Sequence, residues 1–202
     1  NLAGVNPGSR PLTTARKLST ERLFADLRRS PDALHQALSV ITDVTIRFAL
    51  DAIDAGAHGV FFATQLASYR LLAVDDYERF GKAYDLRVLA ALAGKARLSM
   101  LHAHGDDIMF DLLADYPVEM INWHDRLTEP TLRDAASRFP GLLVGGLNEH
   151  GALAKGDLKF RLEGYKLKGS WVLVRTRGYG GRGGARGGQG GEAWLLIKHK
   201  DD

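Results

Sequence analysis

The stretch that decides the fold is Leu98-Ser99-Met100-Leu101-His102-Ala103-His104-Gly105. It begins as an apolar strand and ends in two histidines and a glycine, and Asp106 or Asp107 could then cap a helix. Because alternate side chains of a strand point the same way, we expect His102 and His104 to share one face. The carboxyl ends of parallel strands carry the chemistry of α/β proteins, so this stretch is the first place to expect a site.

Strands and helices alternate on both sides of this stretch. Apolar spacing predicts the following helices and strands: helices over 20–27, 31–55, 75–93, 108–115 and 130–139, and strands over 59–64, 98–102, 120–123 and 142–147. Residues 1–19 are predicted to form a loop. The alternation indicates an α/β fold with a parallel sheet and right-handed crossovers. Four such strands would make half of an eight-stranded TIM barrel, that is, a partial barrel, and a small open doubly wound sheet is the alternative.

The last fifty residues have a different character. Three stretches, 158–162, 171–175 and 194–198, are predicted to be strands of a small antiparallel β segment. Between the last two, nine of the fourteen residues in 178–191 are glycine, which predicts a flexible linker. We therefore predict two domains, a partial barrel of about four parallel βα units over 1–154 and the β segment over 155–202.

Charge and composition limit the function classes. The 202 residues are 45% hydrophobic and contain no cysteine, which excludes disulfides and thiolate metal ligands. No apolar run approaches the roughly 20 residues of a membrane span, so we expect no membrane partner. The absence of cysteine is compatible with the cytoplasmic location that we expect. Residues 151–202 hold 11 Lys and Arg against 5 Asp and Glu, whereas the rest of the chain holds 16 against 19. The chain begins at Asn1 rather than Met, and we expect it to be a fragment.

Seven short motifs carry a resemblance to a known family. They are Pro11-Leu12-Thr13-Thr14, Ser30-Pro31-Asp32, Ala55-Gly56-Ala57-His58-Gly59, Phe61-Phe62-Ala63-Thr64-Gln65, Leu101-His102-Ala103-His104-Gly105, Ile121-Asn122-Trp123-His124-Asp125 and Val144-Gly145-Gly146-Leu147-Asn148. In order and spacing they resemble the uroporphyrinogen decarboxylase superfamily over about residues 10–150. The resemblance implies an incomplete TIM barrel that holds the family's strands four to seven and lacks strands one to three and eight.

The family resemblance implies one of two activities. The decarboxylases are carbon–carbon lyases that act on a tetrapyrrole and use no cofactor, whereas the methyltransferases bind zinc through a His-x-Cys motif. That motif falls on His102-Ala103-His104 in this chain, so zinc is expected if the chain is methyltransferase-like and no cofactor if it is decarboxylase-like. The decarboxylases' active-site tyrosine falls near Lys17, and a substrate-contacting serine falls at Thr64. Because half of the barrel wall would be missing, we expect the fragment to be inactive.

These considerations give a set of candidate site residues. The three histidines His102, His104 and His124 are the candidate general acids, and the first two are also the candidate metal ligands. The residues expected to line the pocket for a small-molecule substrate are Thr64, Gln65, Trp123, Asp125 and Asn148. Exposed edges of the incomplete sheet would also favour self-association.

The C-terminal motifs resemble a second family. They are Lys155-Gly156-Asp157-Leu158-Lys159-Phe160, Lys166-Leu167-Lys168-Gly169-Ser170-Trp171-Val172-Leu173-Val174-Arg175 and Trp194-Leu195-Leu196-Ile197-Lys198-His199-Lys200-Asp201-Asp202. They resemble the final strands of the 3′-phosphoesterase domain of bacterial DNA ligase D, which makes the chain a predicted chimera. The alternative function is then a DNA-repair-associated module whose basic tail contacts DNA. The candidate nucleic-acid contacts are Arg175, Arg177, Arg182, Arg186 and Lys198.

Overall fold

The computed structural model describes residues 4–5, 10–146, 148, 150–163, 165–176 and 193–199. The chain forms two compact units, Asn1–Gly146 and Leu147–Asp202. The boundary between the two units lies after Gly146, eight residues before the boundary after residue 154 that the sequence predicts. The domain limits of 1–154 and 155–202 therefore stay a sequence-based prediction.

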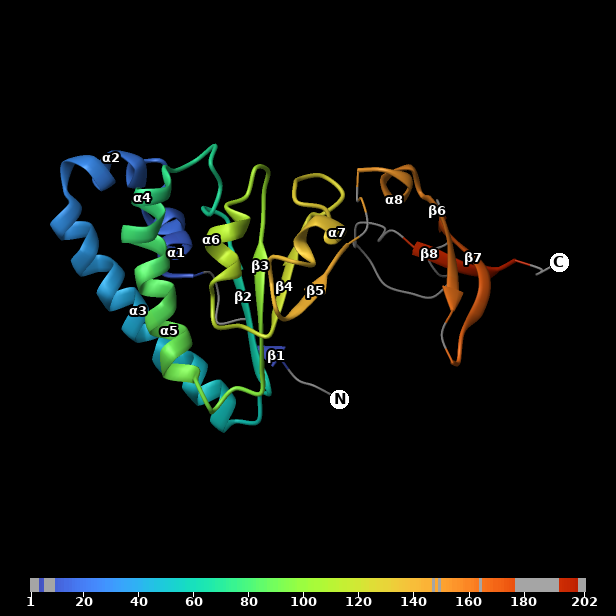
Figure 1. Ribbon diagram of the computed structural model, residues 1–202, viewed down its shortest axis with the longest axis horizontal. Coiled ribbons are helices and arrows are strands. Elements are labelled where there is room, and N and C mark those ends of the chain that lie inside the picture. Colours follow the sequence, from blue (N-terminus) through green and yellow to red (C-terminus); the bar gives the residue numbers. More distant parts are fainter. Residues whose placement is uncertain are drawn as a thin grey trace, which may run out of the picture. The chain divides into compact units, whose positions relative to one another are not determined.

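A parallel sheet organises the first unit (Figure 1). Within the described residues its strand order is β1-β2-β3-β4-β5, and every neighbouring pair is parallel. The strands are β1 (Gly4–Val5), β2 (Gly59–Thr64), β3 (Leu98–Ala103), β4 (Met120–Trp123) and β5 (Leu142–Val144). A doubly wound sheet reverses its strand order at a switch point, whereas this order is sequential. The α/β fold class is confirmed, and the sheet corresponds to part of a barrel.

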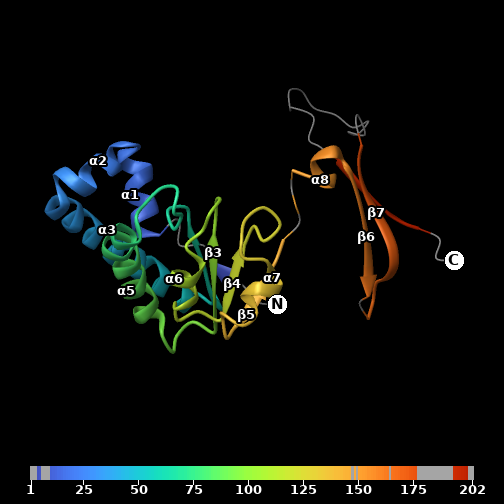
Figure 2. The ribbon, with the colours of Figure 1, turned by 45° about the horizontal axis from the view of Figure 1, so that its top comes forward.

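The core of this unit lies between the sheet and its helices. Figures 1 and 2 show α1, α3 and α5 together on one side of the strands. The helices are α1 (Pro11–Ser19), α2 (Arg22–Arg29), α3 (Pro31–Asp54), α4 (Val74–Tyr77), α5 (Ala83–Leu92), α6 (Phe110–Ala114) and α7 (Leu132–Ala135), with a π-helical turn, η1 (Glu78–Lys82), between α4 and α5. In β2, Val60 and Phe62 are buried while Phe61 is only half-buried. One face of the sheet is therefore packed and the other is more open.

The prediction of a loop over residues 1–19 is wrong, because this stretch contains β1 and α1. Pro11 occupies the first turn of α1. Proline is favoured there because its fixed φ suits the helix and its missing N–H would have no intrahelical partner.

The helices after β3 and β4 are shorter than predicted. Helix α6 begins at Phe110 with Met109 in the N-cap position, so neither Asp106 nor Asp107 caps it. Asp107 instead adopts a φ of 50°, and its N–H donates to Thr128 Oγ1 at 2.9 Å. Helix α7 spans only Leu132–Ala135 rather than 130–139, and strand β5 ends at Val144 rather than at residue 147.

The second unit contains a three-stranded antiparallel sheet in its described part, with order β6-β7-β8. A short helix α8 (Ala152–Lys155) precedes the strands, which are β6 (Asp157–Glu163), β7 (Lys168–Thr176) and β8 (Ala193–Lys198). The predicted antiparallel strands are thereby confirmed. The glycine run 178–191 lies outside the described residues. Among the helices that the structure describes, none combines the length and the apolar character needed to span a membrane.

Candidate metal centre

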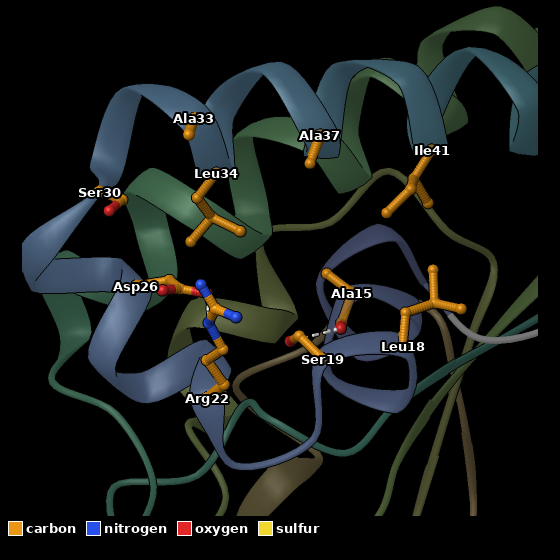
Figure 3. A pocket seen from close by; sticks show the side chains of 10 residues that line it. All are labelled: Ala15, Leu18, Ser19, Arg22, Asp26, Ser30, Ala33, Leu34, Ala37 and Ile41. Carbon is orange, nitrogen blue, oxygen red and sulfur yellow. Dashed lines mark hydrogen bonds and ion pairs between the residues drawn. The ribbon is translucent and has the colours of Figure 1, made fainter.

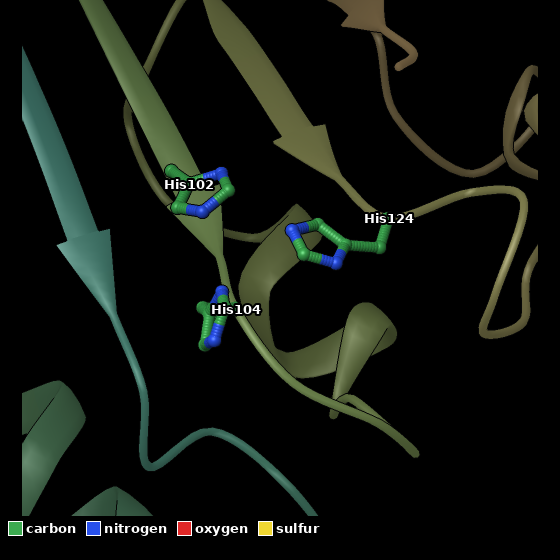
Figure 4. A group of neighbouring side chains, drawn as sticks. All are labelled: His102, His104 and His124. Carbon is green, nitrogen blue, oxygen red and sulfur yellow. The ribbon is translucent and has the colours of Figure 1, made fainter. Parts of the chain in front are cut away.

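Three histidines converge beside the carboxyl ends of β3 and β4 (Figure 4). His102 lies on β3, His104 follows the end of β3, and His124 follows the end of β4. Each ring offers one nitrogen, and these ligand atoms all lie within 4.8 Å of one another. The ring of His104 meets that of His124 edge-on, with centroids 5.0 Å apart. The structure thus brings together the three histidines that the sequence nominates, although their roles stay predictions.

Parallel strand pairing explains this convergence. Ala103 of β3 is in register with Trp123 of β4, so the residues that follow each strand meet at one edge of the sheet. His102 and His104 share the open face of the sheet because they are two residues apart. His102 and His124 are half-buried and His104 is exposed. A small ligand can therefore approach the cluster from the open face.

Two neighbours hold the ring of His102. Phe61 of β2 stacks on it, with ring centroids 5.3 Å apart. Its Nδ1 lies 2.6 Å from Oδ1 of Asn122 on β4. Burial lowers the pKa of His102 below its ordinary value, and the nearby His124 and His104 act in the same direction, whereas the bond to Asn122 opposes the shift. A lowered pKa favours the neutral imidazole, which is the form that binds metals.

The donor set of this cluster fits a zinc ion. Zinc accepts imidazole nitrogens, and catalytic zinc sites keep three protein ligands with a fourth position open for water or substrate. The chain has no cysteine, so the site would contain histidine alone rather than the His-x-Cys pattern. Three imidazoles, with one of them exposed, correspond to the open kind of site rather than a closed structural one.

Thr64 and Trp123 do not join the histidines. Both are at most 2% exposed. Thr64 and Trp123 are the register partners of the buried Ala103, so both lie on the helix side of the sheet, opposite to the histidines. Trp123 Nε1 donates to the carbonyl of Pro130 at 2.8 Å, and its ring packs on Phe110. Thr64 Oγ1 accepts from the N–H of Leu66 at 3.3 Å. None of these contacts supports the substrate-binding roles of Thr64 and Trp123, which stay predictions.

The other predicted pocket residues have varied positions. Gln65 is exposed and directly follows β2, at the same edge of the sheet as the histidines. Asp125 is buried, and its Oδ1 accepts from the N–H of Gly146 at 2.9 Å, which ties together the segments after β4 and β5. Asn148 belongs to the second unit, where its Oδ1 accepts from the N–H of His150 at 2.9 Å.

The candidate nucleic-acid contacts lie in the second unit. Arg175 Nη2 donates to the carbonyl of Ala154 at 2.6 Å, and its guanidinium lies over the ring of Trp194. Lys198 is the last residue of β8. The remaining three, Arg177, Arg182 and Arg186, lie outside the described residues.

A buried polar network on the helix side of the sheet is absent from the sequence-based predictions. Arg10 Nη1 donates at 2.7 Å both to Asp85 Oδ2 and to the Tyr77 hydroxyl, and Tyr116 donates to the same carboxylate oxygen at 3.0 Å. Arg10 and Asp85 are each 1% exposed. Burial raises the pKa of Tyr77 to about 12, although Arg10 opposes this shift. The four members of this network come from separate segments of the chain, so no local sequence pattern predicts that they meet.

Asn122 is the second residue that sequence reasoning missed, although a signal for it existed. It lies two residues before His124, and alternation in β4 places it on the open face. In the sheet it is directly opposite His102. If the inward and outward positions of both strands had been assigned from their alternation, Asn122 would have been predicted to lie beside His102.

A separate hollow of about 290 Å³ lies among α1, α2 and α3 (Figure 3). Its walls include Leu18, Leu34 and Ile41, and Arg22 and Asp26 also line it. None of the candidate site residues lines it. The hollow is therefore a groove in the helix layer and does not belong to the histidine cluster.

Fold and site together define a class of protein: a parallel βα sheet of the barrel type with a histidine cluster beside its strand ends. The family model of uroporphyrinogen decarboxylase (URO-D) matches residues 9–160, and the chain belongs to this family. A solved structure of a methyltransferase from Methanosarcina mazei is similar, with a TM-score of 0.57 and 22% sequence identity. The match covers 68% of this chain and 41% of that one. At this identity the similarity establishes the fold alone.

No curated protein matches the chain. The family match ends at residue 160, within β6, so it covers little of the antiparallel sheet. The resemblance of residues 155–202 to the ligase D phosphoesterase, and with it the predicted chimera, stays a prediction.

Proposed function

We propose that His102, His104 and His124 bind one zinc ion and that this site serves methyl transfer involving a small-molecule substrate. The observation that carries the proposal is the convergence of three imidazoles, whose ligand atoms lie within 4.8 Å of one another at the strand ends. Membership of the uroporphyrinogen decarboxylase family and the methyltransferase fold neighbour are compatible with this chemistry.

The electrostatics of His102 support a metal ligand better than an acid. Burial lowers its pKa, so at neutral pH the ring is uncharged and has a lone pair to offer. When bound, zinc supplies Lewis acidity and lowers the pKa of a coordinated thiol or water. The chain itself would hold the ligand rings in place, with Phe61 stacked on His102 and shielding one side of it.

Tetrapyrrole decarboxylation, which needs no cofactor, is the alternative within the family. It requires a general acid whose pKa lies near the working pH. The lowered pKa of His102 makes that ring a poor proton donor at neutral pH, which leaves His104 and His124 as the candidates. Methyl transfer with zinc is the preferred proposal because it uses all three converging imidazoles, whereas general acid catalysis does not use His102.

We further propose that this chain binds the metal but does not complete a reaction alone. It spans 41% of the length of the methyltransferase that it resembles. A barrel-type site draws residues from many strands, and the described sheet supplies only some of them. Catalytic turnover by the isolated chain of 202 residues would contradict this part of the proposal.

Zinc titration of the metal-free full chain tests the metal site. We expect one zinc per chain, and we expect His102→Ala, His104→Ala and His124→Ala each to weaken binding at least tenfold. His150→Gln in the second unit is the matched control, since it changes a histidine outside the cluster, and it should bind zinc normally. The absence of zinc binding, or binding unaffected by all three cluster substitutions, would overturn the proposal.

Nucleic-acid binding through the basic tail remains the alternative from another class. Counterion release would make such binding fall steeply with salt. Fluorescence anisotropy with a short DNA duplex at low and at high salt distinguishes the two outcomes: salt-sensitive binding supports the alternative, and no binding at low salt ends it.

Self-association through sheet edges is likewise a proposal, which analytical ultracentrifugation of the full chain would decide.

A further inference from the structure

The geometry points to Asn122 as a positioning residue that fixes the tautomer of His102 and leaves its Nε2 free to coordinate. This inference rests on the proposed zinc site, because a fixed tautomer matters there only if His102 is a ligand. It concerns a side chain outside the histidine cluster itself, and its effect on the ring can be measured without metal.

The hydrogen bonds of Asn122 determine its orientation. Its Nδ2 donates to the carbonyl of Val144 at 2.7 Å. A carbonyl can only accept, so the amide nitrogen must face Val144 and the amide oxygen must face the other way. That oxygen is the atom that lies 2.6 Å from Nδ1 of His102.

The orientation of Asn122 then determines where His102 carries its proton. The amide oxygen can only accept, so Nδ1 of His102 must be the donor. In the neutral ring the second nitrogen, Nε2, consequently holds the lone pair. Metal-binding histidines commonly use their other ring N–H in this way, and loss of such a partner typically weakens metal binding about 10–100-fold.

Strand register builds this arrangement into the sheet. His102 is the register partner of Asn122 in β3 and β4, and Asn122 is the register partner of Val144 in β4 and β5. The three residues therefore form one row across three strands. The backbone carbonyl of Val144 cannot rotate independently of β5, so it holds the amide of Asn122 in one orientation. The fold therefore determines the position of the proton on His102 through Asn122.

Nitrogen-15 NMR of the metal-free full chain, at a pH where His102 is neutral, tests the tautomer directly. We expect the Nδ1–H form of His102 to dominate. Asn122→Leu, which keeps a similar volume without an acceptor, should give a mixture of tautomers. Asn122→Asp retains an acceptor oxygen and should restore the Nδ1–H form. Met120→Leu, on the same strand and face, is the matched control and should leave the tautomer unchanged.

Zinc affinity provides the second readout. Asn122→Leu should bind zinc about 10–100-fold more weakly than the unmodified chain. Asn122→Asp and Met120→Leu should remain within about threefold of the unmodified chain. A fold defect in Asn122→Leu would be detected by near-ultraviolet circular dichroism, and the tautomer of the unmodified chain would still decide the question.

The two readouts separate the failure of this inference from the failure of the metal site. An Nε2–H tautomer in the unmodified chain, or zinc binding that Asn122→Leu leaves unchanged, overturns the role of Asn122 even if zinc binds. A chain that shows the Nδ1–H tautomer but binds no zinc refutes the proposed function while the tautomer control by Asn122 stands.

Discussion

The two faces of β3 and β4 differ in what surrounds their side chains. On the helix side, Leu101, Ala103, Ile121 and Trp123 are fully buried. On the open side, the half-buried His102 and Asn122 alternate with them along the same strands. One residue along the chain therefore separates a side chain that packs the core from one that is available for chemistry.

The two faces also satisfy their polar groups differently. Arg10 and Asp85 on the helix side are paired with each other at 1% exposure, and two tyrosine hydroxyls join the network, although Arg10 Nε and Nη2 and Asp85 Oδ1 have no hydrogen-bond partner among the described residues. On the open side the histidines meet other titratable rings and solvent. Substitutions on the helix side should therefore change stability, whereas those on the open side should change metal binding.

The largest effect should follow from breaking the buried ion pair. Asp85→Ala would leave the guanidinium of Arg10 buried without its carboxylate, which typically costs about 3–5 kcal/mol. Urea unfolding, followed by tryptophan fluorescence, measures the free energy of unfolding. Zinc affinity at a temperature well below unfolding should be unchanged.

Two variants control this experiment. Asp43→Ala breaks the exposed pair between Arg87 and Asp43 and should cost about 0–1 kcal/mol. Replacing both buried partners, Arg10→Met with Asp85→Leu, should recover much of the loss because no uncompensated charge remains. Equal effects of Asp85→Ala and Asp43→Ala would mean that burial does not make the Arg10–Asp85 pair more important for stability than an exposed pair.

A smaller effect on the helix side is expected at Trp123. Trp123→Phe keeps an aromatic ring but removes the N–H that donates to Pro130 and leaves space beside Phe110. We expect a loss of about 1–3 kcal/mol in the same unfolding experiment. If the stability stayed the same and binding of a small-molecule ligand weakened instead, Trp123 would belong to the site after all.

The smallest expected effect lies on the open side and depends on pH. The pKa of His102 lies below its ordinary value of 6.5, mainly because the ring is partly buried. The folded chain therefore takes up this proton less readily than the unfolded chain. The resulting stability is present above pH 6.5 and is lost as the pH falls through the folded pKa.

Proton NMR titration of the histidine rings in the metal-free chain measures that pKa. The His102 signal should have a midpoint below 6.5, and His102→Gln should remove its share of the acid-side loss of stability. A midpoint at 6.5 would mean that burial does not disfavour the charged ring, and a midpoint above 6.5 would mean that the bond to Asn122 outweighs burial.

The alternation of side chains made part of the site predictable. It correctly places His102 and His104 on one face, and it could also have shown that Asn122 and His124 share that face while Trp123 does not. The substrate-binding role of Thr64 came from the family resemblance instead, which carries no information on the direction of a side chain. Arg10 was beyond prediction because its partner Asp85 is 75 residues away along the chain.

Helix boundaries were predictable only where the apolar pattern was long. The helix predicted over 31–55 from apolar spacing matches α3 closely, since one pattern persists over many turns. Helices α6 and α7 are each about one turn long, and tertiary packing rather than local spacing determines where they end.

The Arg10 network has a consequence for the order in which the chain folds. The guanidinium can leave water favourably only when the carboxylate of Asp85 and the hydroxyl of Tyr116 are in place to receive it. Asp85 lies 75 residues after Arg10 along the chain, so the network closes a long loop. Helix α1, which has Arg10 at its N-cap, can therefore dock favourably only together with the segments that carry Asp85 and Tyr116.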